Sequence, residues 1–152
     1  MRFLKLMLIA ILMVGFASSA NAKGYQPAKL YMFGFAASFN DSTVFFTDIQ
    51  EVNAYVKNDR NHFLADRSVY SYQLSSYLQT TGRSLHPTCV TMYATTRKEA
   101  EKKYARLKKK YMPILKGKAK GTNRYFIETI PVSEFTYTVS EPVEQEETQP
   151  SR

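Results

Sequence analysis

The apolar residues of this chain fall into short runs that predict four β-strands, over residues 30–39, 43–49, 88–95 and 125–130. The first run is apolar or small on both of its alternating sides, as in a strand that is covered on both faces of a sheet. It should therefore lie at the centre of the sheet. Asn40-Asp41-Ser42 has side chains that favour tight turns, so the first two strands should form a hairpin.

The alternation of apolar and polar residues resumes after Pro131, at Phe135, Tyr137 and Val139. This pattern leaves two possibilities open, a fifth strand or an extension of the fourth strand beyond a bend. Residues 50–65 follow neither a strand pattern nor a helix pattern closely enough to be assigned.

A first helix is predicted to begin near Asp66 or Ser68 and to end near Thr80, with Gly82 as its stop signal. Helical spacing brings the following side chains onto one side: Val69, Tyr70, Gln73, Leu74, Tyr77 and Leu78.

A second helix is predicted from Arg97 to about Met112. Thr96 and Glu99 have the spacing of a capping box, in which a hydroxyl and a carboxylate three residues apart satisfy the first N–H groups of a helix. Its apolar residues form one narrow stripe, and the rest of its surface is charged. The stripe consists of Ala100, Tyr104, Leu107 and Tyr111.

The order strand, strand, helix, strand, helix, strand is typical of a small α+β domain. The simplest architecture is a small mixed or antiparallel sheet of four to five strands with the two helices packed on one face. The other face then needs a cover. The residues after Pro131, residues 50–65 and a second subunit are all candidates for it.

The first 22 residues have the layout of a secretory signal peptide. Arg2 and Lys5 precede an uncharged run over residues 6–17, and Ala20-Asn21-Ala22 supplies small residues before a cut ahead of Lys23. The run has about a dozen residues, whereas a helix needs roughly 20 to cross a bilayer. We therefore expect cleavage after Ala22, a periplasmic or secreted product, and no transmembrane span in the mature chain.

Cleavage would leave residues 23–140 as a single α+β domain and residues 141–152 as a tail. The tail is acidic and almost without apolar residues, so it cannot bury enough surface to offset its chain entropy and should be disordered. It either stays solvated or folds back over the basic part of the domain.

Positive charge is concentrated between Arg97 and Arg124, where twelve basic residues and two acidic ones give a net charge of +10. The whole chain carries +8, so the remaining mature residues are net acidic. This segment is the candidate anion-binding surface. Its expected contact residues are Lys98, Lys102, Lys103, Arg106, Lys109, Lys110, Lys116, Lys118 and Lys120.

The expected partners of this surface are anionic lipid headgroups, lipopolysaccharide, an acidic glycan or an acidic protein. Lysine outnumbers arginine in the segment, and a lysine ammonium is a flexible, strongly hydrated point charge that suits diffuse attraction. Nucleic acid is disfavoured by this lysine content and by the expected export. The alternative without a binding function is a solvated helix face that keeps the domain dispersed in water.

Candidate catalytic and metal-binding residues are sparse. Cys89 is the only cysteine, so no internal disulfide can form, and a cysteine in such a β-prone run is usually a small buried apolar residue. His86 is three residues from Cys89, an odd separation that points the two side chains to opposite sides of a strand. With His62 as the only other histidine, the chain lacks a zinc ligand set, and no cofactor is implied.

These observations favour a non-catalytic, exported binding or interaction module that uses a lysine-rich helix and loop. A structural subunit of an envelope assembly is one alternative, in which the aromatic sheet would be buried against another chain. An enzyme with an unrecognised active site, built around residues such as Glu128 or His62, is the other.

Overall fold

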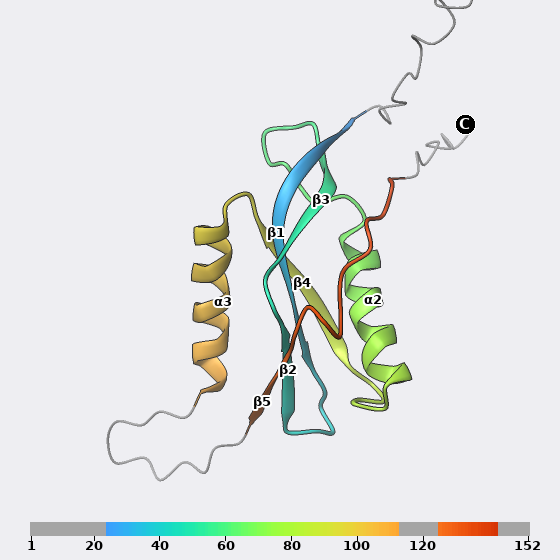
Figure 1. Ribbon diagram of the computed structural model, residues 1–152, viewed down its shortest axis with the longest axis vertical. Helices are drawn as coiled ribbons and strands as arrows, with labels where there is room; N and C mark the ends of the chain where they lie inside the picture. The colour runs from blue at the N-terminus through green and yellow to red at the C-terminus, as the bar shows by residue number, and fades with distance from the viewer. Residues whose placement is uncertain (1–23, 113–124, 143–152) are drawn as a thin grey trace, which may run out of the picture.

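The computed structural model describes residues 24–112 and 125–142, which form one five-stranded mixed sheet and two helices. Figure 1 shows the sheet edge-on with one helix on each side. The α+β class and the mixed sheet are confirmed. The elements are β1 (Tyr25–Ala37), β2 (Thr43–Thr47), β3 (Gln50–Lys57), α2 (Arg67–Thr80), β4 (Thr88–Ala94), α3 (Arg97–Tyr111) and β5 (Phe126–Ile130).

Strand β1 lies at the centre of the sheet, as its two apolar sides predicted. Strand β4 pairs with one of its edges, and β2 and β3 pair in succession with the other, all antiparallel to β1. Strand β5 then pairs parallel with β2. The predicted hairpin of β1 and β2 is confirmed, and in its turn the Asp41 carboxylate accepts a hydrogen bond from the backbone N–H of Thr43 at 2.9 Å.

A bulge separates β2 from β3. Phe46 pairs with Phe35 and Gln50 pairs with Met32, so four steps along one strand match three steps along β1. The extra residue moves the inward side chains from one face of the sheet to the other, because strand side chains alternate with period two. The bulge breaks the continuity of the pattern between β2 and β3. Within β3 itself buried and more exposed positions alternate, and this signal in residues 50–57 was missed in the sequence.

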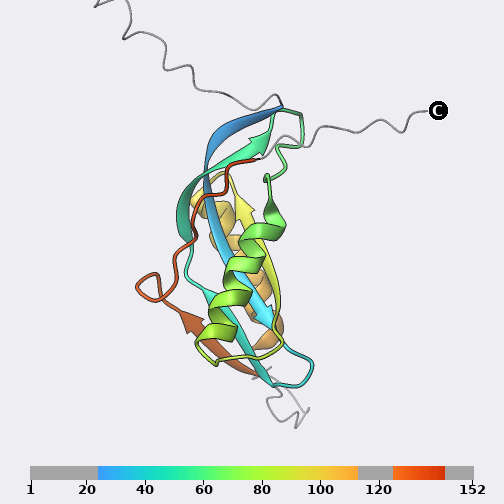
Figure 2. The same ribbon diagram turned by 90° about the vertical axis from the view of Figure 1, so that its right-hand side faces the viewer.

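The prediction that both helices pack on one face of the sheet is wrong. Helices α2 and α3 cover opposite faces, as Figures 1 and 2 show. The chain crosses β1 in one direction between β3 and β4, and it crosses back between β4 and β5. These three strands are parallel to one another, and crossovers of the same hand that run in opposite directions must place their helices on opposite faces.

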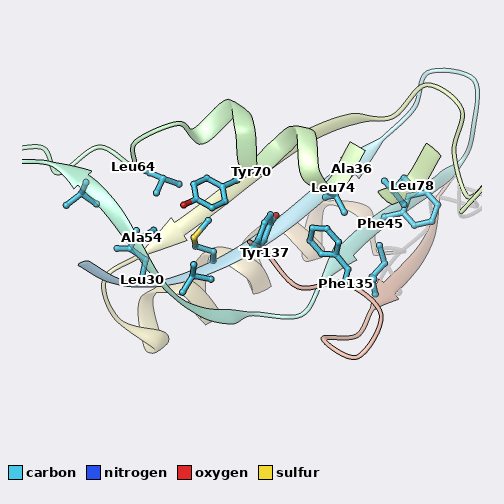
Figure 3. Close-up of a cluster of buried hydrophobic side chains, with 14 residues drawn as sticks. Leu30, Ala36, Phe45, Ala54, Leu64, Tyr70, Leu74, Leu78, Phe135 and Tyr137 are labelled. Carbon is cyan, nitrogen blue, oxygen red and sulfur yellow. The ribbon is translucent and has the colours of Figure 1, made fainter. Parts of the chain in front are cut away.

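The larger core lies between α2 and the sheet (Figure 3). Tyr70, Leu74 and Leu78 of α2 are fully buried against side chains of β1 that include Leu30 and Met32. Helix α2 ends as predicted, and Gly82 just beyond it adopts the left-handed region at a φ of 70°.

The residues from Val132 to Pro142, the last that the structure describes, form no further strand. They cross the α2 side of the sheet as an irregular segment, and Phe135 and Tyr137 complete the core there. Two glutamines hold this segment. Gln50 and Gln73 each donate to one of its carbonyl groups and accept from one of its N–H groups, at distances of 2.8–2.9 Å. The segment and α2 therefore share the cover of one face, while α3 covers the other.

Candidate functional site

Helix α3 begins where its capping box predicted. Thr96 is extended, with φ −124° and ψ 147°, and its hydroxyl accepts a hydrogen bond from the N–H of Glu99 at 3.3 Å. Such a cap contributes about 1 kcal/mol to helix stability. It fixes the first residue of the helix and therefore the direction in which every later lysine points.

An aromatic cluster anchors the inner side of α3. The ring of Tyr104 lies 5.1 Å from Phe33, and the ring of Tyr111 lies 5.0 Å from Phe35, both measured between centroids. Ala100 is fully buried and lets the first turns approach the sheet. The predicted apolar stripe is confirmed, and it orients most of the remaining positions of the helix toward solvent.

Five of the predicted anion-binding residues lie exposed on the outer side of this helix. Their spacing repeats approximately every four residues, which places them along one side of a helix. Within the described ranges, no ion pair includes any of the five. These residues, here called the outer cations, are Lys98, Lys102, Arg106, Lys109 and Lys110.

Lys103 has a different position from the other predicted residues. It is half-buried, and its ammonium group donates to the carbonyl of Tyr93 at 2.9 Å and pairs with Glu99 at 3.2 Å. Its ammonium group therefore interacts mainly with other groups of the protein. Lys116, Lys118 and Lys120 lie outside the described residues.

Positive charge increases along α3. Both acidic residues, Glu99 and Glu101, lie in the first half of the helix, where they pair with Lys103 and Arg97. The second half carries Arg106 and the three consecutive lysines 108–110 with no carboxylate. The field that an approaching anion meets is therefore strongest near the C-terminal end of α3.

A hollow of about 440 Å³ lies beside the outer edge of β4, and Lys103 and Arg67 are among the residues that line it. Arg67 donates to the carbonyl of Thr91 at 2.8 Å and stands over the ring of Tyr93. The Ser71 hydroxyl donates to the hydroxyl of Thr91 and accepts a hydrogen bond from the Thr91 backbone N–H. These groups satisfy backbone atoms that an edge strand would otherwise expose. No pattern in the sequence indicated this role for Arg67, because it depends on β4 being an edge.

The candidates for catalysis are separated in the fold. His62 lines the hollow beside β4, whereas His86 lies in an exposed loop that lines a different hollow. Glu128 pairs with Arg83 at 3.3 Å. Within residues 24–112 and 125–142, no group of three or more His, Cys, Asp and Glu side chains could hold a metal ion.

The thiol of Cys89 is half-buried beneath α2. Burial raises the pKa of this thiol to about 11, and a hydrogen bond with Ser75 opposes that shift. At neutral pH the thiol is therefore protonated, and a protonated thiol is a poor nucleophile.

This pKa predicts a loss of stability in alkali. An exposed cysteine has a pKa of about 8.5. The stabilisation that comes from keeping Cys89 neutral is therefore complete below that pH and is lost as the pH rises toward 11. Between pH 8 and pH 10, the free energy of unfolding should fall by about 1 kcal/mol more in the natural chain than in Cys89→Ala, because solvent screens part of the effect at this half-buried site. Urea unfolding at the two pH values measures this, and equal losses in both chains would contradict it.

No helix in the described part of the chain is both long and apolar enough to cross a membrane. A scan against protein-family models, a search of curated proteins and a search of solved structures each found no match to this chain.

Proposed function

We propose that this protein is an exported, non-catalytic binding module whose outer cations on α3 hold a polyanionic partner. The observation that supports this most directly is the arrangement of Lys98, Lys102, Arg106 and Lys109 along one exposed side of a helix. The aromatic cluster behind α3 holds that side in a fixed orientation, so the cations act together and not as scattered surface charges.

The chemistry of these residues favours a partner with many negative charges at modest spacing. Lysine ammonium groups attract such a surface without requiring bidentate geometry. Lipid headgroups, lipopolysaccharide phosphates, acidic glycans and acidic proteins all fit this description. Each contact would release counterions or be screened by salt, so affinity should fall steeply as ionic strength rises.

A pair of matched variants tests this proposal. Lys102→Gln with Arg106→Gln removes two outer cations, while Lys57→Gln with Arg60→Gln removes two exposed cations near the far end of β3. Glutamine keeps the helix propensity of the residues that it replaces in α3. At low salt, binding to heparin should weaken about tenfold in the first variant and less than about twofold in the second, because each lost contact is worth roughly 0.5–1 kcal/mol.

Isothermal titration calorimetry measures the affinity of each variant for heparin. Circular dichroism checks that both variants are folded. Equal losses in the two variants would show that only total charge matters and would contradict a binding face on α3. Absence of heparin binding at low salt would overturn the proposal itself.

Export is part of the same proposal and has its own measurement. Cleavage after Ala22 would give a mature chain that starts at Lys23. The intact mass of protein recovered from the periplasm or the medium should match that chain. A product that retains Met1 and stays with the cytoplasm would contradict the assignment.

A further inference from the structure

One end of the molecule exposes four large apolar side chains. Relative exposure is 102% for Phe39, 73% for Leu85, 67% for Phe126 and 52% for Met112. They belong to four different segments, namely the turn between β1 and β2, the loop between α2 and β4, the start of β5 and the residue after α3. Single exposed apolar residues are ordinary on a protein surface, whereas a group of them on one part of the surface indicates a contact site.

The structure brings these segments together at the lower end of the molecule in Figure 1. A hollow of about 280 Å³ lies between Ser38, Asn40 and Asp41 of the turn and residues 82–86 of the loop. The N–H of Phe126 donates to the carbonyl of Ser42 at 2.9 Å, which holds the start of β5 beside the turn. The four residues are here called the apolar tip.

Positive charge lies next to the apolar tip. The last turn of α3, with lysines 108–110, ends at Met112, while both carboxylates of the helix lie toward its other end. Of the charged side chains near the tip, Arg83 is paired with Glu128 and Glu134, and the Asp41 carboxylate accepts from the Thr43 N–H. The tip therefore combines exposed apolar side chains with positive charge on the side of α3, while Asp41 and the group of Arg83, Glu128 and Glu134 lie on the side of the turn and the loop.

We propose that this end of the protein docks on an anionic lipid bilayer, with Phe39 and Leu85 entering the interface and the end of α3 contacting headgroup phosphates. The inference rests on the proposed function, since it assigns a partner to the same cations. Apolar side chains beside lysines are the combination by which peripheral proteins bind anionic membranes.

Two other occupants fit the surface less well. A soluble glycan or polyphosphate offers nothing that would cover Phe39 and Leu85. A second copy of the chain would bring the same lysines together and repel, because like charges disfavour contact. A lipid interface matches both parts of the surface at once, because acyl chains can cover Phe39 and Leu85 while headgroup phosphates contact the lysines at the end of α3.

The absence of tryptophan from the chain permits a direct test. Phe39→Trp places a single reporter at the apolar tip. Phe63→Trp places one at a residue of 55% exposure in the loop between β3 and α2, at the opposite end of the molecule. With vesicles of phosphatidylcholine and phosphatidylglycerol, the emission of the first variant should shift to the blue and be quenched by brominated acyl chains. The emission of the second should stay unchanged, as should that of both variants with phosphatidylcholine alone.

A loss-of-function variant separates this inference from the proposed function. Phe39→Ser with Leu85→Ser should weaken binding to the anionic vesicles by about tenfold or more, because both side chains lose their apolar transfer into lipid. The same variant should bind heparin as the natural chain does, because it keeps every lysine. An unchanged melting temperature shows that both serines are tolerated.

The outcomes are distinct. Heparin binding without vesicle binding, or equal blue shifts in the Phe39→Trp and Phe63→Trp variants, overturns membrane docking and leaves the cationic face of α3 intact. If the emission of the Phe39→Trp variant shifts to the blue as protein concentration rises in the absence of lipid, the occupant is a second copy of the chain. This result also overturns membrane docking. If the natural chain binds neither heparin nor anionic vesicles at low salt, both proposals fail.

Discussion

Replacing Gln50 with alanine should lower the free energy of unfolding by about 2–4 kcal/mol, since it leaves two buried backbone groups without partners. The Gln50 side chain donates to the carbonyl of Phe135 and accepts from the N–H of Tyr137, both at 2.9 Å. Both contacts are buried, and Phe135 and Tyr137 are themselves part of the core. The segment after Pro131 should loosen first, and urea unfolding together with hydrogen exchange at Tyr137 would show it.

Gln73 provides a matched control for this prediction. It makes the same pair of hydrogen bonds, to the backbone of Thr138, at 2.8 and 2.9 Å. These bonds are exposed, so water can replace the lost side chain. Gln73→Ala should therefore cost about 0.5–1 kcal/mol. Equal losses for the two variants would show that burial of the Gln50 contacts is not what makes them important.

Gly34→Ala should destabilise the protein by about 2–3 kcal/mol or more, because overpacking a filled core forces neighbouring side chains or the backbone to move. A Cβ atom on Gly34 would lie 2.5 Å from both Leu74 Cδ2 and the Tyr137 hydroxyl, and 3.3 Å from Thr47 Cγ2. Leu74 and Thr47 are fully buried and Tyr137 nearly so, so their neighbours in the core restrict how far they can move. At Gly34, β1, α2 and the segment after Pro131 therefore approach one another closely.

A double-mutant cycle tests the reason for that loss. Leu74→Ala alone creates a cavity and should itself destabilise the protein. The double variant with Gly34→Ala should be more stable than the sum of the two single losses allows, because the shortened side chain removes one of the two closest contacts. Strict additivity in urea unfolding would indicate that the clash with Leu74 is not the cause.

The sequence was most informative where one local interaction determines the outcome. The side chain of Thr96 and the N–H of Glu99 define the first turn of α3 through a contact three residues apart, and the predicted start of the helix is confirmed. The composition of β1, apolar on both alternating sides, likewise identified the central strand. Both signals arise within a dozen residues and need no knowledge of distant parts of the chain.

Long-range features were less accessible. The bulge between β2 and β3 changes which side chains face inward, so a pattern of period two could not be followed through it. The placement of α2 and α3 on opposite faces depends on strand order, which no local pattern records. The irregular segment after Pro131 resembles a strand because Phe135 and Tyr137 alternate inward, yet side chains of Gln50 and Gln73 bind it in place of a neighbouring strand.

The candidate site likewise has features that a local pattern predicted and features that depend on distant parts of the chain. Helical spacing was enough to place Lys98, Lys102 and Arg106 on one outer side. It could not show that Lys103 turns toward the carbonyl of Tyr93, because that contact requires the position of β4. The apolar tip was not foreseen either, since Phe39 and Leu85 are 46 positions apart and the segments that carry them reach the same end of the molecule only through the strand order.

The most direct test of the account is the dependence of heparin affinity on salt concentration. For the natural chain, the logarithm of the association constant should fall linearly with the logarithm of the salt concentration. The slope should become shallower by about 1 for each outer cation replaced by glutamine, as expected when each cation releases counterions from the partner. Replacing Lys57 and Arg60 should leave the slope nearly unchanged. A flat line for the natural chain, or a slope that responds to Lys57 and Arg60 as strongly as to Lys102 and Arg106, would contradict a polyanion-binding face on α3.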